Sequence, residues 1–301
     1  MFYWRSTMLQ LKAFILANEQ IGDRFWRITI AAPQIASTIS PGQFVNLKIS
    51  PSIYPFYPLL RRPFTVLKRI PRANPSAIEI VYEIVGKGTK LMTKLRKGDE
   101  LDLIGPLGQG FSWKRFLDKE VHVLVGGGIG SAALFMLAEE ISQMIPRYNL
   151  KLVIFIDART KDELVLEADF KTLPADLRVA THDGQYGYHG YVTQMLEDYL
   201  DKEGVSHKAV IYACGPEIMY RKLQQICRHY GVPAQISLER HMGCGIGACL
   251  SCVCKVRKET VMKYRNLAAS HIQFVPEKEL GYALVCKDGP VFNIEEVEFD
   301  E

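Results

Sequence analysis

Five of the seven cysteines in this 301-residue chain lie between residues 244 and 286, and their spacing is typical of a metal centre. Cys244, Cys249 and Cys252 form a C-x4-C-x2-C motif, and Cys286 follows after 33 intervening residues. Four thiolates at these intervals are the ligand pattern of a plant-type [2Fe–2S] cluster. Zinc is the alternative, but its structural sites usually use two C-x2-C-like pairs, whereas this motif contains one. Cys254 lies outside the motif and is expected to be a packed thiol.

A second candidate site is a run of glycines that follows a strand-like apolar segment and precedes a predicted helix. Gly128 and Gly130 belong to a G-x-G-x-x-A motif, and Gly126 comes just before it. Such glycines let the backbone approach a pyrophosphate, and the following helix N-terminus attracts its negative charge. The pattern predicts a dinucleotide site, and the alternative is a tight strand–helix turn without a ligand.

Two further turns are expected at the same edge of the sheet. Asp157 ends the next predicted strand, where an acid often bonds the adenosine ribose, which favours NAD over NADP. Arg159 lies two residues further on and could instead contact a 2′-phosphate. The turn Cys214-Gly215-Pro216 follows a later strand and is expected to face the nicotinamide. The competing interpretation of Cys214 is a small buried side chain, and no base is placed beside it to make it a nucleophile.

A third candidate site lies in the first hundred residues. The motif Arg61-Arg62-Pro63-Phe64-Thr65 offers a fixed positive charge for a phosphate and a hydroxyl that can reach a flavin ring edge. The turn Gly86-Lys87-Gly88-Thr89 then offers backbone N–H groups and a second hydroxyl to a pyrophosphate. Because both elements precede the glycine-rich turn, we expect FAD between two domains, where a nicotinamide can pass hydride to it.

The elements that must position these sites change along the chain. In residues 1–115, six short apolar runs separated by turn signals indicate an antiparallel flavin-binding β-barrel, with strands at 8–17, 25–31, 43–49, 63–67, 78–85 and 100–104. In residues 116–235, strands alternate with helices, which is typical of a parallel nucleotide-binding sheet. We expect strands at 121–125, 150–156, 177–181 and 209–213, and helices at 131–145, 191–201 and 217–229. Residues 236–301 are expected to form a small [2Fe–2S] domain.

The composition excludes several classes of protein. A hydrophobic content of 48% is far above that of a disordered chain. The net charge of +4 is too small to indicate nucleic acid, and the chain contains no recognisable nucleic-acid motif. The apolar stretch 121–138, which lacks Asp, Glu, Lys and Arg, contains the glycine run and so suits a turn better than a membrane helix. Because no targeting pattern is recognised, we expect a cytoplasmic protein without membrane partners.

Taken together, the motifs resemble the electron-transfer subunits of NAD-dependent (type B) dihydroorotate dehydrogenase, a family within the ferredoxin-reductase superfamily. The matching segments run in order along most of the chain and are LLRRPFTV, IVYEIVGKGTKLM, VLVGGGIGSAALF, THDGQYGYHGYVT, YACGPEIMYRKL, SLERHMGCGIGACLSCVCKV and VCKDGPVF. The resemblance implies a [2Fe–2S] cluster on the four cysteines named above. It also implies FAD contacts at Arg62–Thr65, at Val81, Tyr82 and Glu83, and at Gly88 and Thr89.

The resemblance further implies a cytoplasmic complex with an FMN-containing catalytic subunit, two copies of each subunit forming a heterotetramer. In pyrimidine biosynthesis, electrons from dihydroorotate would pass through the cluster and FAD to NAD⁺. Three features depart from the family pattern. Glu83 replaces a commonly basic residue, Thr65 replaces a common serine, and the interval 253–285 is unusually long.

Two alternatives remain open from the residues themselves. One is an NAD(P)H reductase of the same superfamily that feeds an oxygenase or hydrogenase. The other is a non-enzymatic metal-binding module that retains the fold. No acid–base pair is recognised, and we therefore assign no catalytic general base.

Overall fold

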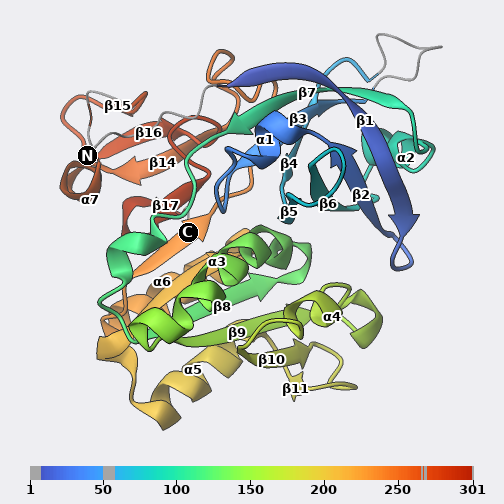
Figure 1. Ribbon diagram of the computed structural model, residues 1–301. Coiled ribbons are helices and arrows are strands. Elements are labelled where there is room, and N and C mark those ends of the chain that lie inside the picture. The colour runs from blue at the N-terminus through green and yellow to red at the C-terminus, as the bar shows by residue number, and fades with distance from the viewer. Residues whose placement is uncertain (1–7, 50–57, 266, 268–269, 300–301) are drawn as a thin grey trace.

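The computed structural model describes residues 8–49, 58–265, 267 and 270–299, which build three sheets (Figure 1). The first sheet is antiparallel and curled, and it consists of β1 (Leu9–Gln20), β2 (Phe25–Ala31), β3 (Phe44–Lys48), β4 (Arg62–Thr65), β5 (Lys68–Ile70), β6 (Ala77–Glu83) and β7 (Glu100–Leu107). Its order is β4-β3-β7-β1-β2-β6-β5, so β4 and β5 are edge strands. The six predicted strands are confirmed, and β5 is additional. The expected barrel is an open half-barrel.

Alternating side chains divide the half-barrel into an inner and an outer face. Ile28 and Ile30 of β2 and Ile78 and Ile80 of β6 are fully buried in one core, as the two-residue strand period requires. The short helices α1 (Pro33–Ala36) and α2 (Lys87–Met92) pack residues into that core. Helix α2 begins at Lys87, within the predicted turn of residues 86–89. The reason is that the Thr89 hydroxyl accepts the N–H groups of the two preceding turn residues, Val85 and Gly86, at 3.0 and 3.2 Å.

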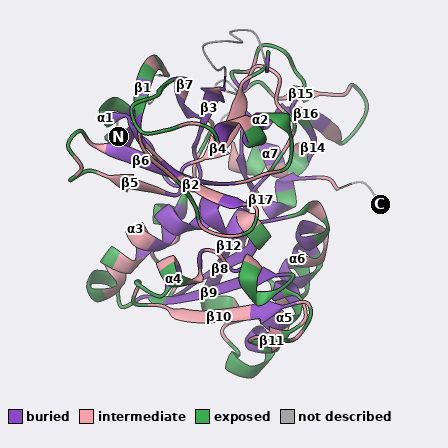
Figure 2. Ribbon diagram, turned by 90° about the vertical axis from the view of Figure 1, so that its right-hand side faces the viewer, coloured by how far each residue is buried: buried purple, intermediate pink, exposed green. Residues whose placement is uncertain are grey.

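The second sheet contains β8 (Val121–Gly127), β9 (Lys151–Ala158), β10 (Asp176–Thr181), β11 (Tyr188–His189), β12 (Ala209–Cys214), β13 (Ala234–Ser237) and β17 (Val291–Asn293). Its order is β11-β10-β9-β8-β12-β13-β17, and every pair is parallel except β13 with β17. Helices α3 (Ala132–Tyr148) and α4 (Glu167–Phe170) pack on one face, and α5 (Val192–Glu203) and α6 (Glu217–Tyr230) pack on the other. The central strands are therefore buried on both sides (Figure 2), which explains their continuous apolar sequences.

Three helices of this sheet end at a residue with a left-handed backbone. Asn149 follows α3, Gly204 follows α5 and Gly231 follows α6, with φ values of 52°, 58° and 66°. Glycine and asparagine tolerate this conformation and let the chain leave the helix towards the next strand. No helix in the described ranges combines the length and apolar character needed to cross a membrane.

The third sheet is small and antiparallel, with β14 (Val253–Arg257), β16 (Leu280–Leu284) and β15 (Gln273–Phe274) in that order. Helix α7 (Lys258–Tyr264) follows β14. The chain then returns to the parallel sheet, where β17 pairs with β13. Residues 236–301, assigned to one domain by the sequence, thus contribute to two sheets, and the boundaries at 115 and 235 stay predictions.

Arg265, just after α7, ties the long interval between the third and fourth cysteines to the chain that follows Cys286. Its guanidinium donates to the carbonyl oxygens of Asp288 at 2.5 Å and Val291 at 3.2 Å. It also pairs with the fully buried Glu296 at 2.5 Å and lies 4.4 Å from the centre of the Phe292 ring. The interval is therefore anchored to the core and is more than a solvated excursion.

His122 gives the parallel sheet a pH-dependent stability. Its buried ring stacks on Tyr212 at 5.8 Å, and burial lowers the pKa of His122 from 6.5 to about 4. As the pH falls from 6.5 to 4, the unfolded chain takes up this proton before the folded one does. The folded state is therefore expected to lose up to about 3 kcal/mol over that window.

Urea unfolding between pH 6.5 and 4 tests this account. We expect His122→Gln to lose less free energy of unfolding over this window than the unaltered protein. His207→Gln, at an exposed position, is the control and should follow the unaltered protein. Parallel curves for His122→Gln and the unaltered protein would show that His122 does not carry the effect.

Candidate functional site

The structure brings the four predicted cluster cysteines together as two pairs. Cys244 and Cys249 share the loop between β13 and β14, and the Cys244 N–H donates to the Cys249 sulfur at 3.3 Å. Cys252 precedes β14, and the N–H of Cys286 donates to its sulfur at 3.4 Å. The Cys244 sulfur accepts three N–H groups at 3.3–3.4 Å, from Ile246, Ala248 and Cys249. Two thiolate pairs match the needs of two irons, and the directed amides would stabilise anionic sulfur.

The local electrostatics favour thiolates at two of these positions. The Ser251 hydroxyl, 3.2 Å from the Cys249 sulfur, lowers the pKa of Cys249 to about 6. A hydrogen bond from Cys286 lowers the pKa of Cys252 to about 6, and the same contact raises the pKa of Cys286. In the part of the chain that the structure describes, no three Cys, His, Asp or Glu side chains gather closely enough to hold a single metal ion.

The cysteine loop is partly open to solvent. Cys249 is exposed, whereas Cys252 and Cys286 are buried. Cys254 lies in β14 and its side chain is buried in the hydrophobic core. Burial raises the pKa of Cys254 to about 12, so it is a packed thiol as expected. The Asn46 amide of β3 donates to the Cys244 carbonyl at 2.9 Å, so the half-barrel holds the cysteine loop directly.

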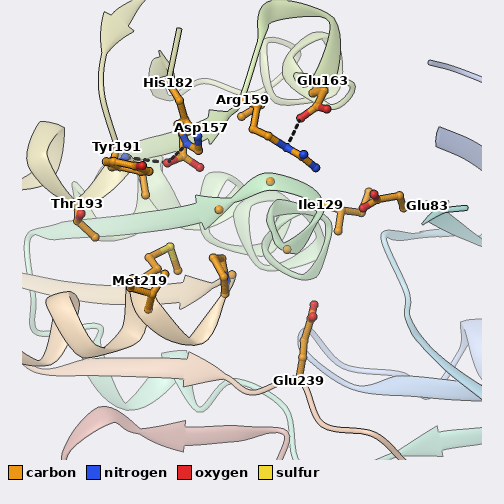
Figure 3. A pocket seen from close by; sticks show the side chains of 18 of the residues that line it. Glu83, Ile129, Asp157, Arg159, Glu163, His182, Tyr191, Thr193, Met219 and Glu239 are labelled. Carbon is orange, nitrogen blue, oxygen red and sulfur yellow. Dashed lines mark hydrogen bonds and ion pairs between the residues drawn. The ribbon is translucent and has the colours of Figure 1, made fainter. Parts of the chain in front are cut away.

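A cavity of about 640 Å³ lies where the half-barrel meets the carboxyl edge of the parallel sheet (Figure 3). The half-barrel contributes Arg24, Phe25 and Glu83, and the sheet contributes the turns that follow β8, β9, β10 and β12. Glu239 also lines the cavity. Its side chain is surrounded by protein atoms but is accessible from the cavity. Burial, with a smaller effect of the Glu83 carboxylate, raises the pKa of Glu239. Strand ends at such an edge are where open parallel sheets bind ligands.

The glycine-rich turn fits against the turn that follows β12. A Cβ on Gly130 would lie 2.8 Å from the carbonyl carbon of Cys214 and 2.9 Å from the Cα of Gly215. Gly128 has a left-handed φ of 55° and lines the cavity with Gly130. Gly126 lies behind the turn, outside the lining. Two of the three predicted glycines therefore face the space that a dinucleotide would occupy.

The three residues of the turn Cys214-Gly215-Pro216 do not all face the cavity. Gly215 and Pro216 line the cavity, whereas the Cys214 side chain is buried and its thiol donates to the Ser237 carbonyl at 3.5 Å. Burial raises the pKa of this thiol. The structure therefore supports the interpretation of Cys214 as a small packed side chain.

Asp157 ends β9 at the cavity, but its carboxylate already has partners. Oδ2 accepts the Val192 N–H at 2.8 Å and lies 3.3 Å from Nε2 of His182. The His182 ring in turn packs against Tyr191 with their centres 4.5 Å apart. Arg159 stands at the rim and pairs with Glu163 at 3.3 Å. His182 and Tyr191 line the cavity and were missed by the sequence reasoning, although His182 follows directly after a predicted strand end.

The two elements predicted to hold FAD adjoin each other. A Cβ on Gly88 would lie 3.1 Å from Nε of Arg62, so the β4 motif and the first turn of α2 adjoin each other. The four residues Arg62–Thr65 are partly exposed along the edge strand β4. The Thr89 hydroxyl closes its own turn, so the backbone N–H groups are what the turn can offer to a phosphate.

Strand β6 presents its three predicted FAD residues to opposite sides. Val81 packs towards the parallel sheet, and Glu83 lines the cavity, where it pairs with Arg24 at 3.1 Å. Tyr82 points into the half-barrel core, where its hydroxyl donates to Asn18 at 3.1 Å. With 2% of its surface exposed, the Tyr82 side chain offers no face to a ligand, because neighbouring strand residues alternate sides.

A curled antiparallel sheet, a parallel sheet with a cavity at their junction and a C-terminal cysteine module define the ferredoxin-reductase-like class of flavin oxidoreductases. A chain of an NADH-dependent reduced ferredoxin–NADP oxidoreductase, solved to study flavin-based electron bifurcation, superposes with a TM-score of 0.73. It is 26% identical over 96% of this chain and 90% of its own. A ferredoxin NADP⁺ reductase from Neisseria gonorrhoeae, solved with FAD and NADP bound, has a TM-score of 0.61 at 18% identity, over 74% of this chain and 92% of its own.

Sequence relatives narrow the class to one family. The electron transfer subunit of dihydroorotate dehydrogenase B (NAD(+)) from Geobacillus thermodenitrificans is 36% identical over 94% of this chain and 96% of its own length. The Bacillus mycoides subunit of the same name is 34% identical over 96% and 99%. The model of the iron-sulfur cluster binding domain of dihydroorotate dehydrogenase B matches residues 239–267. This chain belongs to the family of dihydroorotate dehydrogenase B electron transfer subunits.

Proposed function

We propose that this chain passes electrons from the FMN of a dihydroorotate-oxidising catalytic subunit, through a [2Fe–2S] cluster and FAD, to NAD⁺ in pyrimidine biosynthesis. The observation that most directly supports this proposal is that the cavity and the cysteine loop are close together in the chain. Only five positions separate Glu239, in the cavity lining, from Cys244, in the first thiol pair. The Cα atoms of these residues therefore lie within about 18 Å of each other.

Each proposed cofactor has residues suited to it. The thiols of Cys244, Cys249, Cys252 and Cys286 would bind the two irons. Arg62 and the backbone N–H groups of residues 87–89 would hold the FAD phosphates. The turn at Gly128 and Gly130 would hold the NAD pyrophosphate at the start of the long helix α3. A flavin exchanges hydride with a nicotinamide and single electrons with an iron–sulfur cluster, so it suits the junction between the two sites.

The protein supplies position rather than a general base. Phe25 and Glu239 line the cavity on the side of the half-barrel and the cysteine segment. Arg24 bridges Glu83 of the half-barrel and Glu163 of the parallel sheet at 3.1 and 2.9 Å, which holds the cavity walls together. This clamp would keep two ligands in fixed contact across the junction.

A second candidate function is the reductase component of a different flavin–iron–sulfur complex. It is favoured by the similarity to the ferredoxin–NADP oxidoreductase chain across nearly the whole length. The two functions share the same cofactors and differ in the partner. The anchored interval 253–285 lies beside the cysteine loop and would contribute to the partner surface.

Anaerobic purification of the native complex, followed by reconstitution, tests the proposal. We expect flavin and iron–sulfur absorption, an FMN-containing partner at equal stoichiometry, and a mass equal to two copies of each subunit. The complex should reduce NAD⁺ when dihydroorotate is added. Copurification with an oxygenase or hydrogenase component, without dihydroorotate oxidation, would favour the second candidate. We place the complex in the cytoplasm, where a reducing compartment keeps the thiols available for iron.

A further inference from the structure

One end of the cavity is built from residues that the proposed function does not yet use. Asp157, His182 and Tyr191 lie together there, away from Glu83 and Glu239 (Figure 3). This end lies beyond β9 and β10, where the adenosine half of a dinucleotide is held when its pyrophosphate lies on the glycine-rich turn.

Asp157 is poorly placed to read the ribose itself. Its side chain is 7% exposed, and the same oxygen, Oδ2, accepts the Val192 N–H and faces Nε2 of His182. Val192 is the first residue of α5. The Asp157 carboxylate therefore fixes the start of this helix as well as the orientation of the His182 ring. Asp157 is thus a positioning residue, and His182 presents the next polar surface towards the cavity.

The contact with Asp157 assigns the tautomer of His182. A carboxylate is an acceptor, so Nε2 carries the proton and donates to Asp157. In the neutral imidazole, the other nitrogen, Nδ1, then holds a lone pair, and it has no hydrogen-bond partner among the described residues. A lone pair accepts a hydrogen bond from a hydroxyl, but it repels a phosphate oxygen that carries no proton.

The charged groups around this end also disfavour an added phosphate. Arg159 faces Glu163 at 3.3 Å, and Arg24 faces the same carboxylate at 2.9 Å. Lys222, further along the lining, pairs with Glu197 at 3.0 Å. A 2′-phosphate would therefore meet cations that already have carboxylate partners, and it would lie close to the buried charge of Asp157.

Tyr191 completes the subsite with an apolar face. Its ring is 57% exposed, lines the cavity and packs against His182 at 4.5 Å. An exposed ring at this end can cover the face of an adenine irrespective of what the ribose carries. Its contribution to binding should therefore be the same for both nucleotides.

We propose that His182, oriented by Asp157, accepts a hydrogen bond from the adenosine ribose 2′-hydroxyl and so makes the site prefer NAD(H) over NADP(H), with Tyr191 covering the adenine. This inference rests on the nucleotide site of the proposed function. It moves the recognition of the ribose from Asp157, where the sequence placed it, to His182.

Binding of NADH, NADPH, 5′-AMP and 2′,5′-ADP to the whole purified complex, measured by calorimetry, tests the proposal without electron transfer. His182→Ala should weaken NADH and 5′-AMP by about three- to tenfold, the loss of one hydrogen bond. It should not weaken the 2′-phosphorylated ligands NADPH and 2′,5′-ADP, because it removes the lone pair that repels their phosphate. Asp157→Ala removes the acceptor that orients the ring and should shift the preference towards 2′,5′-ADP with His182 still present. Asp157→Asn keeps an oxygen that can accept from both the Val192 N–H and Nε2, and it should therefore keep the preference.

Two controls separate this role from a general loss of structure. Tyr191→Leu should weaken all four ligands by similar factors and leave the preference unchanged. His189→Ala alters an exposed histidine of the neighbouring strand β11 that does not line the cavity, and it should bind like the unaltered protein. Melting temperatures of all variants identify any that fail to fold.

The outcomes distinguish the inference from the proposed function. An unaltered protein that binds NADH, together with an unchanged preference in folded His182→Ala and Asp157→Ala, would overturn the role of His182 alone. An unaltered folded complex that binds none of the four ligands would overturn both the inference and the nucleotide site.

Discussion

Cys252→Ser is expected to remove the iron–sulfur absorption and to lower dihydroorotate-dependent NAD⁺ reduction by more than about 100-fold. Changes in residues that merely support a metal ligand already cost 10- to 100-fold, and a serine hydroxyl stays protonated where a thiol ionises. Cys252 is buried, and its sulfur accepts the N–H of Cys286. Oxidation of NADH by a small artificial acceptor should persist, because the cavity and the residues proposed to hold FAD are unaltered.

Cys254→Ser is the matched control for this result. It makes the same chemical change two residues away, at a thiol that is packed in β14. We expect it to retain the iron and to lose at most about 1–3 kcal/mol of stability from the buried hydroxyl. Equal loss of iron in both variants, or full iron content in Cys252→Ser, would contradict the assignment of the cluster ligands.

Gly130→Val is expected to abolish measurable NADH binding. Even the first carbon of a side chain would lie 2.8 Å from the Cys214 backbone, and neither that backbone nor β12 beneath it can move aside cheaply. The turns after β8 and β12 would have to separate, which reshapes the floor of the cavity. Overpacking of this kind also costs about 1–3 kcal/mol of stability. Calorimetric titration with NADH and a thermal melt measure the two effects.

Gly204→Asn provides the comparison for that variant. Gly204 has a left-handed φ of 58° at the end of α5. A side chain there would meet no atom within 4 Å, and the residue does not line the cavity. Asparagine tolerates this conformation, so binding should be unchanged and the melting temperature nearly so. NADH binding that survives in Gly130→Val would show that this turn does not hold the nucleotide.

Strands with strong local patterns were predicted closely from the sequence. The apolar segments of β8, β9 and β12 were placed to within about two residues, because burial on both faces leaves a continuous signal. Strand β5 was missed because it has only three residues, Lys68, Arg69 and Ile70, and two of them are charged. Strand β17 was missed because its pairing with β13 depends on residues more than fifty positions earlier.

The candidate sites show the same division between local and distant information. The four cysteines proposed to bind the cluster can be recognised in the sequence because their types and intervals indicate the chemistry directly. Tyr82 and Cys214 were included with their motifs, yet a motif does not say which side chain turns towards the core. His182, Tyr191 and Glu239 were missed because a cavity wall assembled from separate loops has no signature in one stretch of sequence.

The return of β17 to the edge of β13 limits how this protein can be divided. A graft that exchanged the whole carboxyl-terminal region for that of another reductase would strip the nucleotide sheet of its outermost strand and leave β13 uncovered. A transplant confined to the stretch between Leu238 and Val291 would keep that strand, but it would sever the Arg265–Glu296 pair. Adapting this protein to a new redox partner therefore requires that the segments carrying Arg265 and Glu296 be replaced together.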